Sequence, residues 1–211
     1  MIIDHVGFIL FPQSVLFRII GRLSMPLFAF TTGQGFRHSK NIKNYIFLLF
    51  LFGCISQPIY SIFFRNGNLN IFFELLLGVI ALLAYRRLKN KTHGFITVLL
   101  FGIIATALNF EYGFYGILTI FIFGVYEFKN HFTKIAWYFA INTLIYVFVG
   151  ILLDPEIFSK HYLWSIIQVF SIPSLLLIMF YNGHRGPSHK YLFYILYPLH
   201  LLILLLVKPI V

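Results

Sequence analysis

Three stretches of the sequence, 45–64, 135–153 and 162–181, each run for about 20 residues without a charged side chain. A helix needs about 20 mostly apolar residues to cross the hydrocarbon core of a bilayer. The whole chain is 60% hydrophobic and only 10% charged, which is more apolar surface than a water-soluble globule of 211 residues can bury. We therefore predict an integral membrane protein in contact with membrane lipid.

Charged and turn residues divide the chain into nine apolar segments. Backbone polar groups must be hydrogen-bonded within lipid, and the segments are continuously apolar rather than alternating, so they predict helices rather than barrel strands. The predicted fold class is all-α, a polytopic transmembrane helical bundle that forms one domain over residues 1–211. The first segment is short for a span. The segments are 1–12, 15–35, 45–64, 70–85, 94–110, 113–128, 135–153, 162–181 and 191–208.

The loops between these segments alternate between rich and poor in basic residues. The loops after the second, fourth, sixth and eighth segments hold eleven of the sixteen Lys and Arg residues. By the positive-inside rule these loops are predicted to be cytoplasmic in a multi-pass protein of the cell membrane. Topology therefore accounts for the net charge of +10, and we expect no nucleic acid partner. The single cysteine, Cys54, predicts neither a disulfide framework nor a metal site.

Ionisable side chains within the apolar segments are the candidates for function, because each is costly to place in lipid. His5 is the candidate general base, and a buried packing histidine is the alternative. Arg18 and Arg22 lie one helical turn apart, which suits binding an anion or neutralising Asp4. A structural ion pair of Asp4 with an arginine is the alternative.

Two other intramembrane groups have competing structural interpretations. Glu74 lies in the first turn of its helix, where a carboxylate stabilises the helix dipole. Pro198 is expected to kink the helix that carries His200 and to free a backbone carbonyl, so a structural role is favoured for this histidine. Glu111 is assigned to a turn at the outer face.

An ordered series of motifs resembles the TraX family. The motifs are Asp4-His5-Val6-Gly7, Arg18 to Phe30, Gly35-Phe36-Arg37-His38, Ile55 to Tyr60, Asn70 to Gly78, Tyr112 to Gly116, Tyr181 to Gly186 and Tyr194 to His200. The resemblance covers nearly the whole chain. It implies a membrane acetyltransferase like the one that acetylates the pilin N-terminus in conjugation. The family is also similar to transmembrane acyltransferases in which a membrane-embedded histidine serves acyl transfer from a coenzyme A thioester.

Two departures from the family pattern bear on the site. Relatives usually have about ten more residues before the Asp-His pair, which would complete a span of about 20 residues. We therefore expect the first helix to be incomplete. Gln34 stands where relatives often have Glu, so Asp4 is expected to carry more of the negative charge of the site.

The resemblance implies acetyl-CoA as acyl donor and a peptide amine or cell-envelope molecule as acceptor. We predict that His5 deprotonates the acceptor, that Arg22 or Gln57 steadies the oxyanion, and that Asp4 holds Arg18 or Arg22 in place. The predicted partners of the donor phosphates are basic residues of the cytoplasmic face: Arg37, Lys40, Arg86, Arg87 and Arg185. The predicted polar lining is Gln34, Gln57, Glu74 and His200.

A non-enzymatic membrane protein is the alternative to this enzyme. In a transporter or an assembly scaffold, the same buried Asp, His and Arg side chains would line a path or pin helices together. Transporters often contain internal repeats and paired broken helices, and the sequence contains no evident repeat. The transporter alternative is therefore the weaker one.

Overall fold

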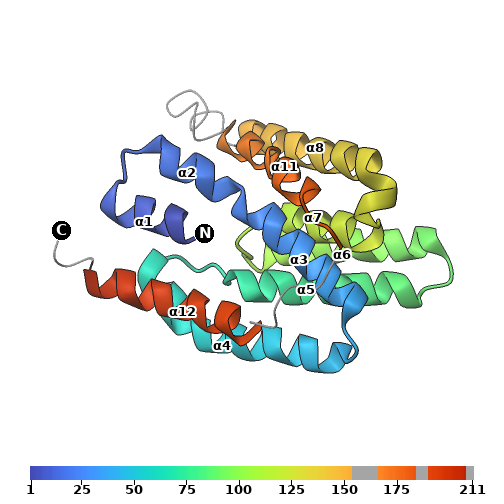
Figure 1. The fold of residues 1–211 in the computed structure, drawn as a ribbon, viewed down its shortest axis with the longest axis horizontal. Helices are drawn as coiled ribbons and strands as arrows, with labels where there is room; N and C mark the ends of the chain where they lie inside the picture. Colours follow the sequence, from blue (N-terminus) through green and yellow to red (C-terminus); the bar gives the residue numbers. More distant parts are fainter. Residues whose placement is uncertain (154–165, 184–189, 208–211) are drawn as a thin grey trace.

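The computed structural model describes residues 1–153, 166–183 and 190–207, and over these ranges the protein is all-α (Figure 1). Short turns join successive helices from α1 to α8, and one isolated parallel β-bridge pairs Leu69 with Phe110. The helices are α1 (Ile2–Leu10), α2 (Val15–Arg22), α3 (Ser24–His38), α4 (Ile42–Phe64), α5 (Ile71–Arg87), α6 (Lys91–Ala107), α7 (Gly113–Val125), α8 (Phe128–Leu153), the 3₁₀-helix η1 (Ile167–Ser171), α11 (Ser174–Met179) and α12 (Lys190–Val207).

Three helical stretches are long and apolar enough to cross a membrane: Val15–His38, Ile42–Phe64 and Asn130–Leu153. Large apolar side chains cover their outer faces. In α8, for example, Trp137 is 65% exposed and Phe148 is 61% exposed. Such surfaces are costly in water and suited to lipid. The chain is therefore a multi-pass helical membrane protein, and the remaining apolar segments form shorter helices.

Asparagine caps explain where several helices begin. Asn41, Asn70 and Asn90 precede α4, α5 and α6, and each side-chain oxygen accepts a hydrogen bond from a backbone N–H of the first turn. Caps of this kind satisfy donors that have no partner within the helix. As a result α4 and α6 begin three residues before the predicted starts at 45 and 94.

The core is centred on α7, which packs against α3, α5, α6 and α8. Its Ile117 and Ile120 side chains are fully buried. Small residues allow close helix contacts here, since a Cβ added at Gly33 of α3 would lie 2.9 Å from the backbone of Phe123. Close approach through glycine is a common way to pack helices in membranes.

Two predicted segments differ from single helices. The segment 15–35 forms α2 and α3, which are separated at Leu23. Pro26 lies in the first turn of α3, and its ring nitrogen cannot donate the hydrogen bond that would continue α2. Within the predicted segment 162–181, residues 166–181 contain a 3₁₀-helix and then the short α11, which begins after Pro173.

The connections α3–α4, α5–α6 and α7–α8 lie at the same end of the bundle (Figure 1). Basic residues lie in or beside the first two of these connections: Arg37, Lys40 and Lys43 at the first, and Arg86, Arg87 and Lys89 at the second. We call this end of the molecule the basic end. The turns that join α1 to α2 and α4 to α5 lie at the opposite end (Figure 1).

Candidate active site

Two histidines that are distant in the sequence meet inside the helix bundle. His5 on α1 and His200 on α12 are both buried, and Nδ1 of His5 lies 2.8 Å from Nε2 of His200. The two ring planes differ by 11°. Phe63 and Phe64, in the last turn of α4, pack against His5 with ring centroids 5.7 and 5.2 Å from its own. The pair therefore lies toward the end of the bundle opposite the basic end.

Hydrogen bonding assigns the protons of the neutral pair. Nδ1 of His200 lies 2.8 Å from the backbone oxygen of Leu196, and a carbonyl oxygen can only accept. His200 Nδ1 must therefore be the donor, which leaves its Nε2 to accept from Nδ1 of His5. Nε2 of His5 is then the unprotonated nitrogen. A general base needs such a lone pair.

Asp4 joins α1 to α2 through charged contacts. Its Oδ1 lies 2.9 Å from Nη1 of Arg18 and 3.6 Å from Nη2 of Arg22. Successive helical residues point about 100° apart, so the carboxylate and the neighbouring imidazole face different partners. Any side chain at Gly21 would collide with Asp4, which explains the glycine at this crossing. The shared carboxylate partly neutralises two cations inside the bundle.

Arg22 extends this cluster to the 3₁₀-helix. Its Nη1 donates to Oε1 of Gln168 at 3.4 Å, and Nε2 of Gln168 donates to the Tyr115 hydroxyl at 3.2 Å. That hydroxyl lies 3.2 Å from Oγ of Ser171. Irregular helical turns often mark functional positions in a helix. Gln168 was not among the predicted site residues, although a glutamine within a charge-free apolar run was a usable signal.

Glu111 is a further acidic residue near the cluster. It lies in the turn between α6 and α7, within electrostatic range of Arg22 and Asp4. Burial raises the pKa of Glu111 to about 7, and the positive charge of Arg22 opposes this rise. Its position in a turn gave no sequence signal that it would interact electrostatically with Arg22.

Gln57 is bonded to the turn between α4 and α5. Its Oε1 accepts hydrogen bonds from the backbone N and from Nδ2 of Asn70, at 3.0 and 2.8 Å. Its Nε2 donates to the backbone oxygen of Asn68 at 2.9 Å and to Oγ of Ser61 at 3.1 Å. These four bonds use the amide fully, so its contacts are those of a structural residue.

Glu74, on α5, is fully buried and caps a neighbouring helix. Its Oε2 accepts hydrogen bonds from the backbone N–H groups of Tyr112 and Gly113, at 3.2 and 3.1 Å. The first amide groups of a helix lack intrahelical partners, and a carboxylate there also complements the helix dipole. The sequence suggested that Glu74 stabilises its own helix, and the structure shows contacts with the start of α7.

Arg37 is bound to the end of α7. Its guanidinium donates to the backbone oxygens of Phe123 and Gly124, each at about 3 Å, and to that of Tyr126. Carbonyl groups at a helix C-terminus commonly bind basic side chains in this way. The predicted phosphate ligand thus holds α3 to α7.

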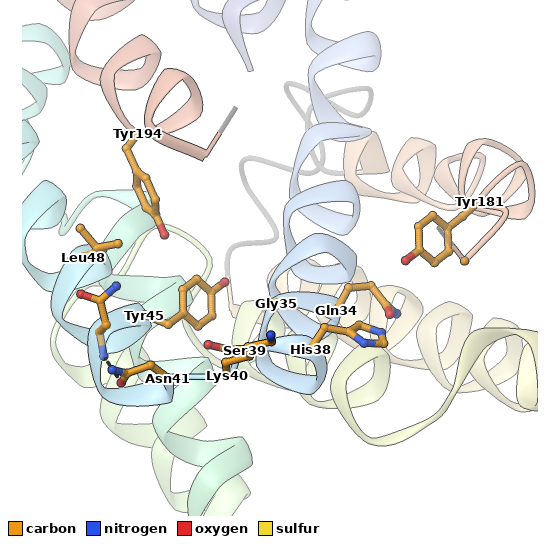
Figure 2. Close-up of a pocket in the computed structure, with 12 residues that line it drawn as sticks. Gln34, Gly35, His38, Ser39, Lys40, Asn41, Tyr45, Leu48, Tyr181 and Tyr194 are labelled. Carbon is orange, nitrogen blue, oxygen red and sulfur yellow. Dashed lines mark hydrogen bonds between the residues drawn. The ribbon is translucent and has the colours of Figure 1, made fainter. Parts of the chain in front are cut away.

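The other predicted donor ligands are Lys40, Arg86, Arg87 and Arg185, and Gln34 belongs to the predicted polar lining. Gln34 and Lys40 line a cavity at the basic end (Figure 2). Arg86 and Arg87 are exposed at the C-terminus of α5 and do not line this cavity. Arg185 lies outside the described residues.

Helix α1 supplies the imidazole and the carboxylate at the centre of the candidate site. This helix places an imidazole with a free lone pair next to a carboxylate that holds two guanidinium groups. An imidazole can remove a proton from an amine or a hydroxyl, and a guanidinium can stabilise developing negative charge. Such a combination suits addition to a carbonyl group followed by loss of a leaving group.

The chain is similar to known proteins over most of its length. The family model described as TraX protein matches residues 1–208. The probable fimbrial assembly protein FimC, serogroup H1, of Dichelobacter nodosus is 28% identical over 208 residues, which cover 89% of this chain and 80% of that protein. An uncharacterized protein of Rickettsia prowazekii (strain Madrid E) is 34% identical over 79 residues, 37% of this chain and 30% of that protein. No solved structure matches the chain.

Proposed function

Because the chain belongs to the TraX family, we propose that it is a membrane-embedded acetyltransferase that moves an acetyl group from acetyl-CoA to a peptide amine or cell-surface acceptor. The observation that carries this proposal is the buried pair of His5 and His200. Its hydrogen bonds leave the basic nitrogen of His5 unprotonated. A base of this kind can activate an acceptor for acyl transfer.

The proposed reaction is a direct transfer. The acceptor nitrogen or oxygen attacks the thioester carbonyl carbon while its proton passes to Nε2 of His5. The carbon–sulfur bond then breaks, and the sulfur leaves with that proton as the thiol of coenzyme A. Negative charge on the carbonyl oxygen would be stabilised by Arg22, since Gln57 is already bonded to the α4–α5 turn. Asp4 keeps Arg22 in position.

The arrangement of the helices suggests how the two substrates reach the site. We propose that all nine predicted segments cross or enter the membrane and that the basic end is cytoplasmic. Acetyl-CoA would then enter from the basic end. His5 lies against the last turn of α4, toward the opposite end, where an exported acceptor would arrive.

The nature of the acceptor is suggested by a relative. The matching protein of Dichelobacter nodosus is named as a probable fimbrial assembly protein. This name favours a pilin-type subunit as acceptor, and the acetyl group would be transferred to an exposed amine of that subunit.

The same name also suits a second function, an assembly scaffold without catalysis. In that case the Asp4, Arg18 and Arg22 cluster would pin α1 to α2, and the histidine pair would pin α1 to α12. Both functions predict that these residues matter for folding. Only the enzyme requires acetyl-CoA.

The test measures transfer from labelled acetyl-CoA by purified protein in lipid nanodiscs, with a panel of peptides and glycans as acceptors. We expect His5→Ala to lower kcat about hundredfold or more, the usual contribution of a general base. The matched control is His93→Ala, because His93 is an exposed histidine at the basic end and its loss should change nothing. If folded wild-type protein neither binds acetyl-CoA nor turns over the thioester, the enzymatic function is wrong. Normal turnover by His5→Ala would remove only the assignment of the base.

A further inference from the structure

A cavity of about 590 Å³ lies at the basic end, between α3, α4 and the start of α12 (Figure 2). Its walls include Gln34 of α3, Tyr45 of α4 and Tyr194 of α12. Cavities of roughly 300 to 1,000 Å³ are typical of small-molecule sites. The cavity is separate from the histidine pair and from the arginine cluster, and neither contributes to its walls.

The lining of the cavity is polar, aromatic and cationic. The side-chain amides of Gln34 and Asn44 offer both donors and acceptors, and three tyrosines offer ring faces and hydroxyl groups. Lys40 supplies a positive charge and His38 an imidazole, and the described residues that line the cavity include no carboxylate. Amides match the edge of a purine, aromatic rings stack on its face, and a lysine binds phosphate. This combination suits an anionic adenine nucleotide.

A row of packed aromatic rings along one face of α12 runs from the cavity to the histidine pair. Tyr194, which lines the cavity, stacks on Phe52 with centroids 4.9 Å apart and lies against Phe72 at 5.7 Å. Phe72 contacts Tyr197, and Tyr197 contacts His200 with centroids 5.1 and 5.5 Å apart. Tyr194 and His200 are six residues apart, or about 9 Å along a helix.

We propose that this cavity binds the nucleotide end of the acyl donor, an ADP unit with a third phosphate on its ribose, and that the pantetheine arm follows α12 to the histidine pair. This inference rests on the proposed acetyltransferase function. It places the nucleotide at the walls of the cavity rather than at the arginines predicted from the sequence. Arg37 is bonded to the end of α7, whereas Lys40 lies at the cavity.

The first experiment measures binding of adenosine 3′-phosphate 5′-diphosphate, which is this nucleotide end, to purified protein by calorimetry. We expect Lys40→Glu to weaken binding about tenfold or more, because a repulsive charge replaces a partner of phosphate. Asn44→Leu should also weaken it. Lys43→Glu is the matched control, since Lys43 is an exposed lysine in the first turn of α4, three residues from Lys40, but does not line the cavity. It should bind the nucleotide within about twofold of wild type, as expected for a solvent-screened charge.

The second experiment compares two acyl donors, acetyl-CoA and acetyl-pantetheine, which lacks the nucleotide. Lys40→Glu should raise the KM for acetyl-CoA with little change in kcat, and it should turn over acetyl-pantetheine as the wild type does. If the wild-type protein transfers acetyl groups and Lys40→Glu and Asn44→Leu do so equally well, the cavity assignment is wrong and the acetyltransferase function stands. If nucleotide binding depends on Lys40 but no acetyl transfer occurs, the cavity assignment is supported and the acetyltransferase function is wrong. If the wild-type protein does not bind adenosine 3′-phosphate 5′-diphosphate, the cavity assignment is wrong.

Discussion

The α4–α5 turn and the α1–α2 hairpin both carry polar side chains into the end of the bundle opposite the basic loops, but they use them differently. At the turn, the Gln57 amide is bonded to groups at most 13 residues away in the chain, most of them backbone or amide groups. At the hairpin, Asp4 and His5 are bonded to side chains, and the partner of His5 is 195 residues away. An amide whose hydrogen bonds are all made to residues nearby in the chain stabilises the turn. Ionisable side chains that meet between helices can instead transfer protons or stabilise charge.

The largest effect is expected from Asp4→Asn, which removes the charge that Arg18 and Arg22 share. Breaking one partner of a largely buried ion pair leaves uncompensated charge in the bundle, and we expect a loss of about 3 kcal/mol in the free energy of unfolding. Thermal unfolding in detergent measures it. Arg18→Gln added to Asp4→Asn should recover part of the loss. Strictly additive effects of the two substitutions would contradict the shared-charge interpretation.

His200→Ala tests the histidine half of the comparison. We expect kcat to fall about hundredfold, or about 2.7 kcal/mol, because His5 loses the acceptor that holds its Nδ1 proton. His200→Gln should restore most of the rate, since an amide oxygen can accept the same bond. The kcat values for acetyl transfer, with their pH profiles, are the measurement. Equal losses in the two variants would mean that His200 acts by packing alone.

Gln57→Leu tests the other side of the comparison, the α4–α5 turn. It leaves two N–H groups of Asn70 without their acceptor, which should cost about 2 kcal/mol of stability. Because this amide serves the turn, kcat per folded molecule should not change. Ile62→Ala is the control on the same helix, since Ile62 is 63% exposed. A fall in kcat with unchanged stability would place Gln57 in the reaction instead.

The smallest effect is expected from Glu111→Gln. Burial raises the pKa of Glu111 from its ordinary 4.5 to about 7 in the folded protein, so the folded state favours the protonated form. The corresponding stability is complete below pH 4.5 and is lost as the pH rises through 7. Glutamine stays neutral, so the variant should unfold at a higher temperature than wild type at pH 8 and at the same temperature at pH 4. The same difference at both pH values would show that Glu111 does not titrate in this range.

Several properties of this protein were decided by the sequence alone. Long charge-free runs require a bilayer and internally bonded backbones. The prediction of an all-α fold is confirmed over the described residues, three stretches of which are long and apolar enough to cross a membrane, whereas the nine predicted spans stay a prediction. The ordered motifs predicted the TraX family, which the family match over residues 1–208 confirms. Hydropathy and motif order can be read along the chain, which is why they needed no tertiary information.

Only the tertiary structure could decide which polar groups share a partner. The meeting of His5 with His200, the use of Arg37 to hold the end of α7, and the link from Arg22 to Gln168 all join different helices. No local pattern specifies which helices will be neighbours, because the apolar segments are nearly uniform in composition. Helix packing therefore determined which of the buried polar residues became structural contacts and which became a candidate active site.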